Sequence, residues 1–363
     1  MVDISKDYFH KNQEQNRRAN NVLTSLYNSG AIPLLTWHHI EELLAHKNDK
    51  VVSNSIALVR NLPFVASLIC HSVPFHIGSI IDIETIEFKN ILSHPNVGLE
   101  KITEETRKDI FYFCSGEDLI TPYMPHIENL RQEILAKENR KKEIASISRA
   151  QSIQPQETKL SFLRNSKLRS LKTAEPILHK MQNTLKDEIH QKGDKKIQCP
   201  EKTVNEFMAS VYDSGRQMHS SSGSIEERFL KEFGLNTEET KHFKTLEQVQ
   251  YLSIFKKRLG IIAKNFPHNR QNSILELKES SCPSWLLWKE LHKIRTKADR
   301  ANGSDLNDGY LAGLVCYASL TIVDKRTNEY LLQIQRKDKE LKSIIGKFEK
   351  ISHYEKIIDH LPE

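Results

Sequence analysis

The chain has 363 residues, of which 38% are hydrophobic and 28% are charged. A chain of this length can bury one large core or two smaller ones, and this composition is typical of a globular protein with a polar surface. No apolar run approaches the roughly 20 residues of a transmembrane helix, and residues 1–6 lack the apolar run of a signal peptide. We therefore expect a cytoplasmic protein without membrane contact. The net charge of +6 is compatible with a polyanionic partner.

The five cysteines are scattered along the chain and form no closely spaced pair. This spacing predicts neither a zinc site nor a disulfide framework. The glycine-rich motifs of NTPases and dinucleotide-binding proteins and the GxSxG motif of α/β-hydrolases are also absent. The sequence gives no support for those classes of enzyme.

The N-terminal third predicts short strands alternating with helices. Residues 32–36 form an apolar run that predicts a buried strand, and Thr36 is a candidate N-cap for an amphipathic helix that follows it. Residues 51–62 predict a second helix, because their apolar side chains recur at helical spacing and a proline comes next. A further helical stretch ends near residues 94–95.

From about residue 131 the composition becomes basic. Residues 131–196 contain sixteen Lys/Arg and eight Asp/Glu, so this segment alone has a net charge of +8. Its apolar residues recur at helical spacing, which predicts a helical and partly mobile insertion over residues 131–249. The candidate contacts to a nucleic-acid backbone are Arg140, Lys141, Lys142, Lys167, Arg169 and Lys172.

The C-terminal part returns to alternating helices and a strand. Residues 246–266 predict a helix, another helix opens at Pro283, and residues 321–323 predict a strand that ends on Asp324. A polar helix is predicted over residues 328–350. Strands alternating with helices predict an α/β domain with a mostly parallel sheet. This domain would be discontinuous, formed by residues 1–130 and 250–363.

Five carboxylates stand where such a sheet would bring them together. Asp305 and Asp308 lie in the first turn of a predicted helix, where free N–H groups and the helix dipole favour negative charge. Asp324 follows a predicted strand, at the edge of the sheet where α/β proteins build their sites. Asp3 and Glu42 complete the set. Hard divalent cations such as Mg²⁺ prefer oxygen ligands of this kind.

Three of these segments resemble the sequence pattern of PIN-domain nucleases. Residues 35–43 match its strand–Thr–helix–Glu–Leu element, residues 305–312 match its helix opening with an acid, and residues 320–325 match its strand ending in an acid. The resemblance implies a PIN-like parallel sheet flanked by helices, with a strand that ends at Asp3. It also implies acids that bind Mg²⁺ or Mn²⁺, a substrate that is usually RNA, and a role as a bacterial toxin or a phage-defence effector.

We therefore expect a metal-dependent endonuclease, with RNA favoured over DNA as its substrate. Asp3, Glu42, Asp308 and Asp324 are its expected catalytic residues, and these four with Asp305 are its expected Mg²⁺ or Mn²⁺ ligands. The alternative is a non-catalytic nucleic-acid-binding or scaffold protein, because only two residues precede Asp3 and leave its strand incomplete. A homo-oligomer and a regulatory protein partner both remain open.

Other polar residues near these segments are expected to be structural. His38 and His39 precede the candidate Glu42, but packed or surface histidines are the commoner case. Glu41 is expected to face solvent, and Glu87 flanks a buried stretch.

The basic segment generates the first prediction. Reversing the charges of Arg140, Lys141 and Lys142 should weaken nucleic-acid binding and flatten its dependence on salt, because fewer counterions are then released from the phosphates. Titrations of labelled RNA at several salt concentrations measure both quantities. An unchanged affinity and salt slope would mean that these side chains belong to a solvated face only.

Overall fold

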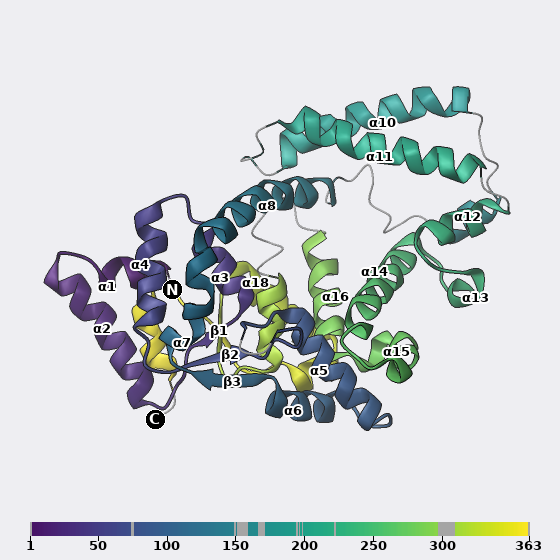
Figure 1. Cartoon of the computed structure of the whole chain (residues 1–363). Helices are drawn as coiled ribbons and strands as arrows, with labels where there is room; N and C mark the ends of the chain where they lie inside the picture. The colour runs from purple at the N-terminus through teal and green to yellow at the C-terminus, as the bar shows by residue number, and fades with distance from the viewer. Residues whose placement is uncertain are drawn as a thin grey trace. The chain divides into compact units, whose positions relative to one another are not determined.

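The computed structural model divides the chain into two compact units. It describes residues 2–73, 76–148, 150, 159–165, 171–193, 195, 197, 199–220, 223–296 and 309–361. The first unit contains residues 1–138, 262–291 and 307–363, and the second contains residues 139–261 and 292–306. Three helices contribute residues to both units, namely α8 (Ile127–Ser148), α14 (Leu246–Ala263) and α16 (Pro283–Thr296) (Figure 1).

The remaining elements of the first unit are mostly helices. In chain order they are α1 (Val2–Tyr8), α2 (Gln13–Asn28), β1 (Leu34–Leu35), α3 (Trp37–Leu44), α4 (Asp49–Arg60), β2 (Val65–Leu68), α5 (Ile80–Ser93), α6 (Leu99–Asp109), β3 (Phe111–Cys114), α7 (Gly116–Ile120), η1 (Thr121–His126), α15 (His268–Leu275), η3 (Glu279–Ser281), η4 (Gly313–Cys316), β4 (Thr321–Val323), α18 (Lys325–Lys337), α19 (Lys339–Ile344), β5 (Phe348–Lys350) and η5 (Tyr354–His360). Among the described residues, no helix is both long enough and apolar enough to cross a membrane.

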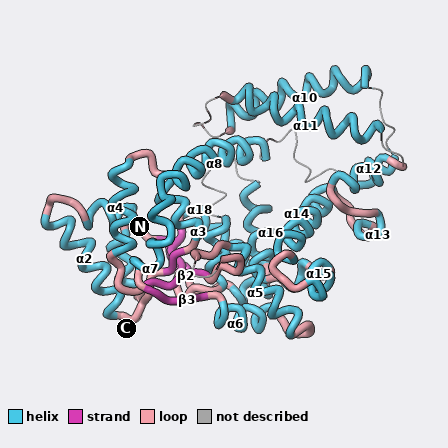
Figure 2. The backbone as a smooth tube through the Cα atoms, viewed as in Figure 1, coloured by secondary structure: helices cyan, strands magenta, loops and turns pink. Residues whose placement is uncertain are grey.

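The predicted PIN-like parallel sheet flanked by helices is wrong. Of the described residues 72% are helical, and Figure 2 shows helices in cyan far outnumbering the strands in magenta. The described strands form only a three-stranded sheet in the order β1-β2-β3 and a two-stranded sheet of β4 and β5. β1 is parallel to β2, whereas β3 is antiparallel to β2. The strand expected over residues 32–36 is reduced to two residues, because Pro33 has no N–H to donate and Thr36 already caps α3.

One face of the three-stranded sheet packs on the main core of the first unit. Leu35, Val65, Tyr112 and Cys114 belong to this face, since successive residues of a strand alternate between faces. All four pack into a hydrophobic cluster that also contains Ile40, Leu43, Leu44, Val52, Ile56, Val59, Leu62, Ile77, Leu119, Ile120, Tyr123 and Ile134. Helices α3, α4 and α7 and the first half of α8 therefore cover this face of the sheet.

The C-terminal segment contains a break that the sequence pattern does not predict. A single helix is expected over residues 328–350, but α18 ends at Lys337 and residues 348–350 form β5 instead. Asp338 has an extended backbone, and its carboxylate accepts a hydrogen bond of 2.9 Å from the amide of Leu341. Asp338 therefore caps α19, and β5 turns back to pair in parallel with β4.

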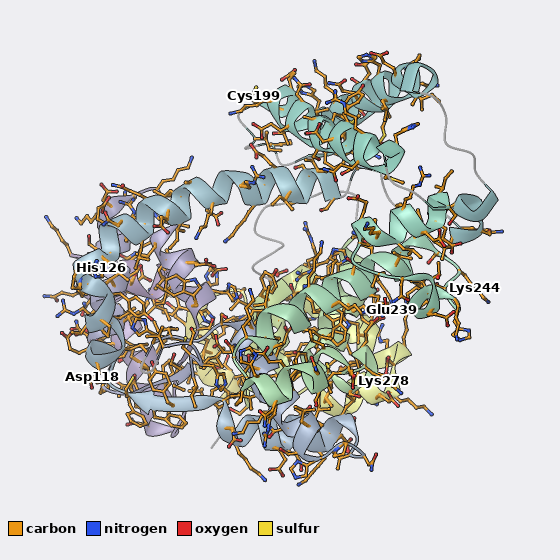
Figure 3. The ribbon with its side chains drawn as sticks, turned by 45° about the vertical axis from the view of Figure 1, so that its right-hand side comes forward. Asp118, His126, Cys199, Glu239, Lys244 and Lys278 are labelled. Atoms are coloured by element: carbon orange, nitrogen blue, oxygen red, sulfur yellow. The ribbon has the colours of Figure 1, made fainter. Side chains whose placement is uncertain are left out.

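The second unit contains helices and no strand among the elements that the structure describes. Besides its parts of α8, α14 and α16 it contains α9 (Leu160–Asn165), α10 (Leu171–Lys192), α11 (Pro200–Ser220), α12 (Ile225–Glu232) and α13 (Thr237–Thr240). α10 and α11 pack through Leu185, Ile189, Val204 and Met208. A second cluster joins α9 and α12 to α14. Glu239 of α13, labelled in Figure 3, forms an ion pair with Lys256 of α14.

A buried carboxylate connects three distant segments of the first unit. Glu87 on α5 is fully buried, and it accepts hydrogen bonds of 2.9 Å and 2.8 Å from the amide and the hydroxyl of Ser284. Ser284 lies in the first turn of α16, where backbone amides have no partner within the helix. Glu87, on another helix, accepts a hydrogen bond from one of these amides. The hydroxyl of Tyr317, just after η4, donates a third hydrogen bond to Glu87. This carboxylate joins α5, α16 and η4.

Burial raises the pKa of Glu87 from its ordinary value of 4.5 to about 7, and the hydrogen bonds from Tyr317 and Ser284 oppose this shift. The charge of Glu84, one turn earlier on α5, also raises the pKa of Glu87. Because the folded chain holds this proton more tightly than the unfolded chain, stability falls as the pH rises from about 4.5 to 7. A shift of this size corresponds to about 3 kcal/mol at most.

Substitution of Glu87 tests this account. Glu87→Gln removes the titration but keeps an acceptor, so the variant should lack the loss of stability that the parent shows between pH 4.5 and 7. Glu87→Ala should destabilise the protein by about 3 kcal/mol at pH 7, because it leaves buried donors without a partner. Denaturant unfolding at several pH values measures both effects. Parallel pH profiles for the parent and Glu87→Gln would contradict the assignment.

Candidate carboxylate site

The start of α3 is fixed by a reciprocal cap. The Thr36 amide donates a hydrogen bond of 3.1 Å to Nδ1 of His39, and the Thr36 hydroxyl lies 3.0 Å from the same nitrogen. Burial lowers the pKa of His39 to about 4, so its ring is neutral near pH 7 and can accept from the Thr36 amide. The amide of Trp37 donates to the carbonyl oxygen of Gly78 at 2.9 Å, which joins α3 to the residues before α5.

His38 and Glu41 form a pair on α3, at the i, i+3 spacing that places side chains on one face of a helix. Nδ1 of His38 lies 3.1 Å from a carboxylate oxygen of Glu41, and each side chain is only 14% exposed. The expectation that Glu41 faces solvent is therefore wrong. Glu42, the next residue, is exposed.

The segment that begins at Tyr310 reaches α3. The Tyr310 ring stacks on the His38 ring, with centroids 5.1 Å apart and planes inclined by 10°. Residues 309–312 are helical and lead into η4. Gly313 lies so close to Ile80 that an added Cβ would stand 3.2 Å from the Ile80 Cδ1. The chain that follows the acidic residues 305–308 is thus held against α3 and the start of α5.

Asp324 directly follows β4, as the sequence predicts, and caps α18. Its Oδ1 accepts from the amides of Arg326 and Thr327 at 2.6 Å and 3.0 Å, and its Oδ2 accepts from the Thr327 hydroxyl at 2.7 Å. This strand does not share a sheet with β1, as the predicted parallel sheet would require, because β4 pairs with β5 whereas β1 pairs with β2. Asp324 has a demonstrated structural role as an N-cap.

The other acids of the expected set are Asp3, Asp305 and Asp308. Asp3 lies in the first turn of α1, not at the end of a strand, and its carboxylate pairs with Lys6 at 3.1 Å. Asp305 and Asp308 lie outside the described residues. Within the described part of the chain, no three or more His, Cys, Asp or Glu side chains gather as a metal would require.

Four of the six basic residues expected to contact nucleic acid are described, and they lie on two helices. Arg140 on α8 is exposed, and Lys141 and Lys142 beside it are half-buried. Lys172 lies in α10. Lys167 and Arg169 lie outside the described residues. In α8 these three consecutive cations lie between Glu138 and Glu143, so the helix has a mixed charge pattern and not a continuous basic stripe.

Sequence reasoning missed the contribution of His38, Tyr310 and Glu41 to this region. The i, i+3 spacing of His38 and Glu41 was a usable local signal, because such pairs meet on a helix surface. The stacking of Tyr310 on His38 joins residues far apart in the chain, and no local pattern predicts it.

Comparison of the chain with protein-family models, with curated proteins and with solved structures finds no match.

Two substitutions separate the structural role of Asp324 from any chemical role. Asp324→Ala removes the cap and should destabilise the protein by about 1 kcal/mol, whereas Asp324→Asn should cost much less, because asparagine is an equally good N-cap. Asp338→Ala, which removes the cap of α19, is the matched control and should resemble Asp324→Ala. Chemical unfolding measures all three. Equal losses in the alanine and asparagine variants of Asp324 would show that its charge, and not its capping geometry, stabilises the fold.

Proposed function

We propose that this chain is a metal-dependent nuclease that hydrolyses phosphodiester bonds, most readily in RNA, with its acids gathered around the start of α3. The observation that carries the proposal is the stacking of Tyr310 on His38. It brings the chain that follows Asp305 and Asp308 in sequence to the helix that bears Glu41 and Glu42. Acids that are far apart in the sequence thus belong to segments that meet in the fold.

The chemistry of the donors fits a hard divalent cation. Carboxylate oxygens are the ligands that Mg²⁺ and Mn²⁺ prefer, and Mg²⁺ in particular usually keeps several waters and needs few protein ligands. In the proposal Glu42, Asp308 and Asp324 would hold the ion, with Asp3 and Asp305 as further candidates from the sequence. A bound ion of this kind supplies an activated water and stabilises charge on the leaving oxygen. The similarity of residues 35–43 and 320–325 to PIN-domain motifs supports this assignment of roles.

The chain's own residues would orient these ligands. Thr36 and His39 fix the first turn of α3, and His38 restrains Glu41 beside Glu42. The amides of α18 orient the carboxylate of Asp324. The excess of Lys and Arg in residues 131–196 would attract the phosphate backbone of a nucleic acid. A toxin or antiviral-defence role rests on the PIN-domain similarity alone.

A second candidate is a nucleic-acid-binding or scaffold protein without catalysis. Two observations favour it. Asp3 is paired with Lys6 on a helix, and the carboxylate of Asp324 is engaged in capping α18. In this alternative the acids stabilise the fold, and the basic residues alone make contact with nucleic acid.

Cleavage assays with the full chain separate the two candidates. Labelled single-stranded RNA and DNA should be cut with Mg²⁺ or Mn²⁺ and left intact with excess EDTA. Asp308→Asn and Glu42→Gln should each lower cleavage by more than about 100-fold, because losing a ligand costs more than the loss of an outer-shell partner. Glu100→Gln, a change of an exposed acid on α6, is the control and should retain full activity.

Thermal stability supplies a readout that does not depend on activity. Mn²⁺ should raise the melting temperature of the parent and of Glu100→Gln through binding linkage, and should raise it less in Asp308→Asn. Cleavage that persists in EDTA, or full activity in Asp308→Asn, would remove the metal-carboxylate mechanism. Binding of RNA without cleavage under any metal condition would favour the second candidate.

A further inference from the structure

The three-stranded sheet carries an exposed apolar row on the face that does not pack on the main core. Phe113 of β3 is 53% exposed, Phe64 before β2 is 42% exposed, and Ile32 before β1 is 36% exposed. The pairing of Ala66 with Leu34 and with Phe113 places these three residues on one face, because residues two apart along a strand share a face. The rings of Phe64 and Phe113 stack at 5.8 Å with planes inclined by 9°.

β3 is an edge strand of this sheet, and its outward hydrogen-bonding groups can be identified. Hydrogen-bonded and non-hydrogen-bonded pairs alternate along an antiparallel ladder. The amide of Ile69 donates to the carbonyl of Ile110 at 2.9 Å, which identifies the first hydrogen-bonded pair. The backbone N–H and C=O groups of Tyr112 and Cys114 therefore form hydrogen bonds with β2. Those of Phe111 and Phe113 point away from β2, toward the open edge of the sheet.

The other side of β2 supports this assignment. Ala66, which faces Phe113, donates its amide to the carbonyl of Pro33 on the side of β1 and not to β3. Leu68, which faces Phe111, accepts from Gly78 in the same way. Among the described residues, no backbone hydrogen bond outside the β2–β3 pairing involves Phe111 or Phe113.

We infer that the β3 edge is a dimerisation surface, on which a second copy of this chain adds its own β3 in antiparallel orientation about a two-fold axis through Tyr112. In this arrangement Phe111 of each copy faces Phe113 of the other. Each facing pair exchanges two hydrogen bonds, so the outward groups of both strands are satisfied. Facing residues lie on the same side of the sheet, so the phenylalanine rings of both copies would meet beside Phe64.

Two features of β3 favour a second copy over an unrelated partner. The strand Phe111–Cys114 contains no charged residue, so a two-fold axis brings no like charges together. Exposed edge strands usually carry lysine, proline or a bulge that prevents pairing, and β3 has none of the three. The small number of residues involved gives an area well below that of a stable interface, so the dimer would be weak and dependent on concentration.

Analytical ultracentrifugation of the full chain tests the inference. From low micromolar to submillimolar concentration the mass should rise from 42.0 kDa toward twice that value. Phe113→Lys should remain monomeric over this range. Ile261→Lys is the matched control, because Ile261 is also 53% exposed but lies on α14 in the second unit, and it should dimerise as the parent does.

A second variant and a second measurement cover the case in which Phe113→Lys fails to fold. Phe113→Thr introduces a β-branched residue, which favours a strand, and should weaken dimerisation about 10-fold, since aromatic cross-strand pairs are lost. Hydrogen exchange at the amides of Phe111 and Phe113 should slow as the parent is concentrated. A parent that stays monomeric, or a dimer whose edge amides exchange as fast as in the monomer, would overturn the proposal. Pairing of this edge with a different protein instead of a second copy would overturn it as well.

Discussion

The buried carboxylate of Glu87 is the interaction on which the first unit most depends. Removing a carboxylate from water is costly, and this one is tolerated because three donors from two distant segments converge on it. Ser284 places the start of α16 against α5, and Tyr317 does the same for the end of η4.

The Glu87 anchor also explains how the candidate site is organised. With Tyr317 fixed, the segment back to Tyr310 lies between α5 and α3, where a Cβ at Gly313 would stand only 3.2 Å from the Ile80 Cδ1. Additional bonds hold the same segment, because Arg107 donates to the carbonyl of Cys316 and Gly346 donates to that of Val315. The stacking of Tyr310 on His38 is therefore the end of a firmly held stretch of chain. In the sequence, Glu42 follows His38 by four residues and Asp308 precedes Tyr310 by two.

Local features of the fold were predictable from the sequence, whereas its pairings were not. The helices expected over residues 51–62 and 246–266 correspond closely to α4 and α14, because caps and apolar spacing act over a few residues. β4 pairs with β5 and not with β1, and this choice depends on contacts between residues far apart in the sequence. β3 was missed because Phe111–Cys114 has no alternation of apolar and polar residues.

In the candidate site too, local features were predictable from the sequence and long-range contacts were not. The position of Asp324 after a strand followed from its β-branched neighbours, but its engagement as the cap of α18 required the structure. The strand expected before Asp3 is replaced by α1, whose Ile4 packs against Ala19 and Leu58. A motif can thus locate an acid along the chain correctly, although the sheet that would assemble the acids is absent.

We propose that one divalent ion binds between α3, the helical residues 309–312 and the start of α18. Paramagnetic broadening of NMR signals by substoichiometric Mn²⁺, with Mg²⁺ as the diamagnetic reference, tests it most directly. The proposal predicts selective broadening of the amides of Glu41, Glu42, Tyr310 and Thr327, with the helices α10 and α11 unaffected. Broadening centred elsewhere, or none at Mn²⁺ concentrations that support cleavage, would contradict it.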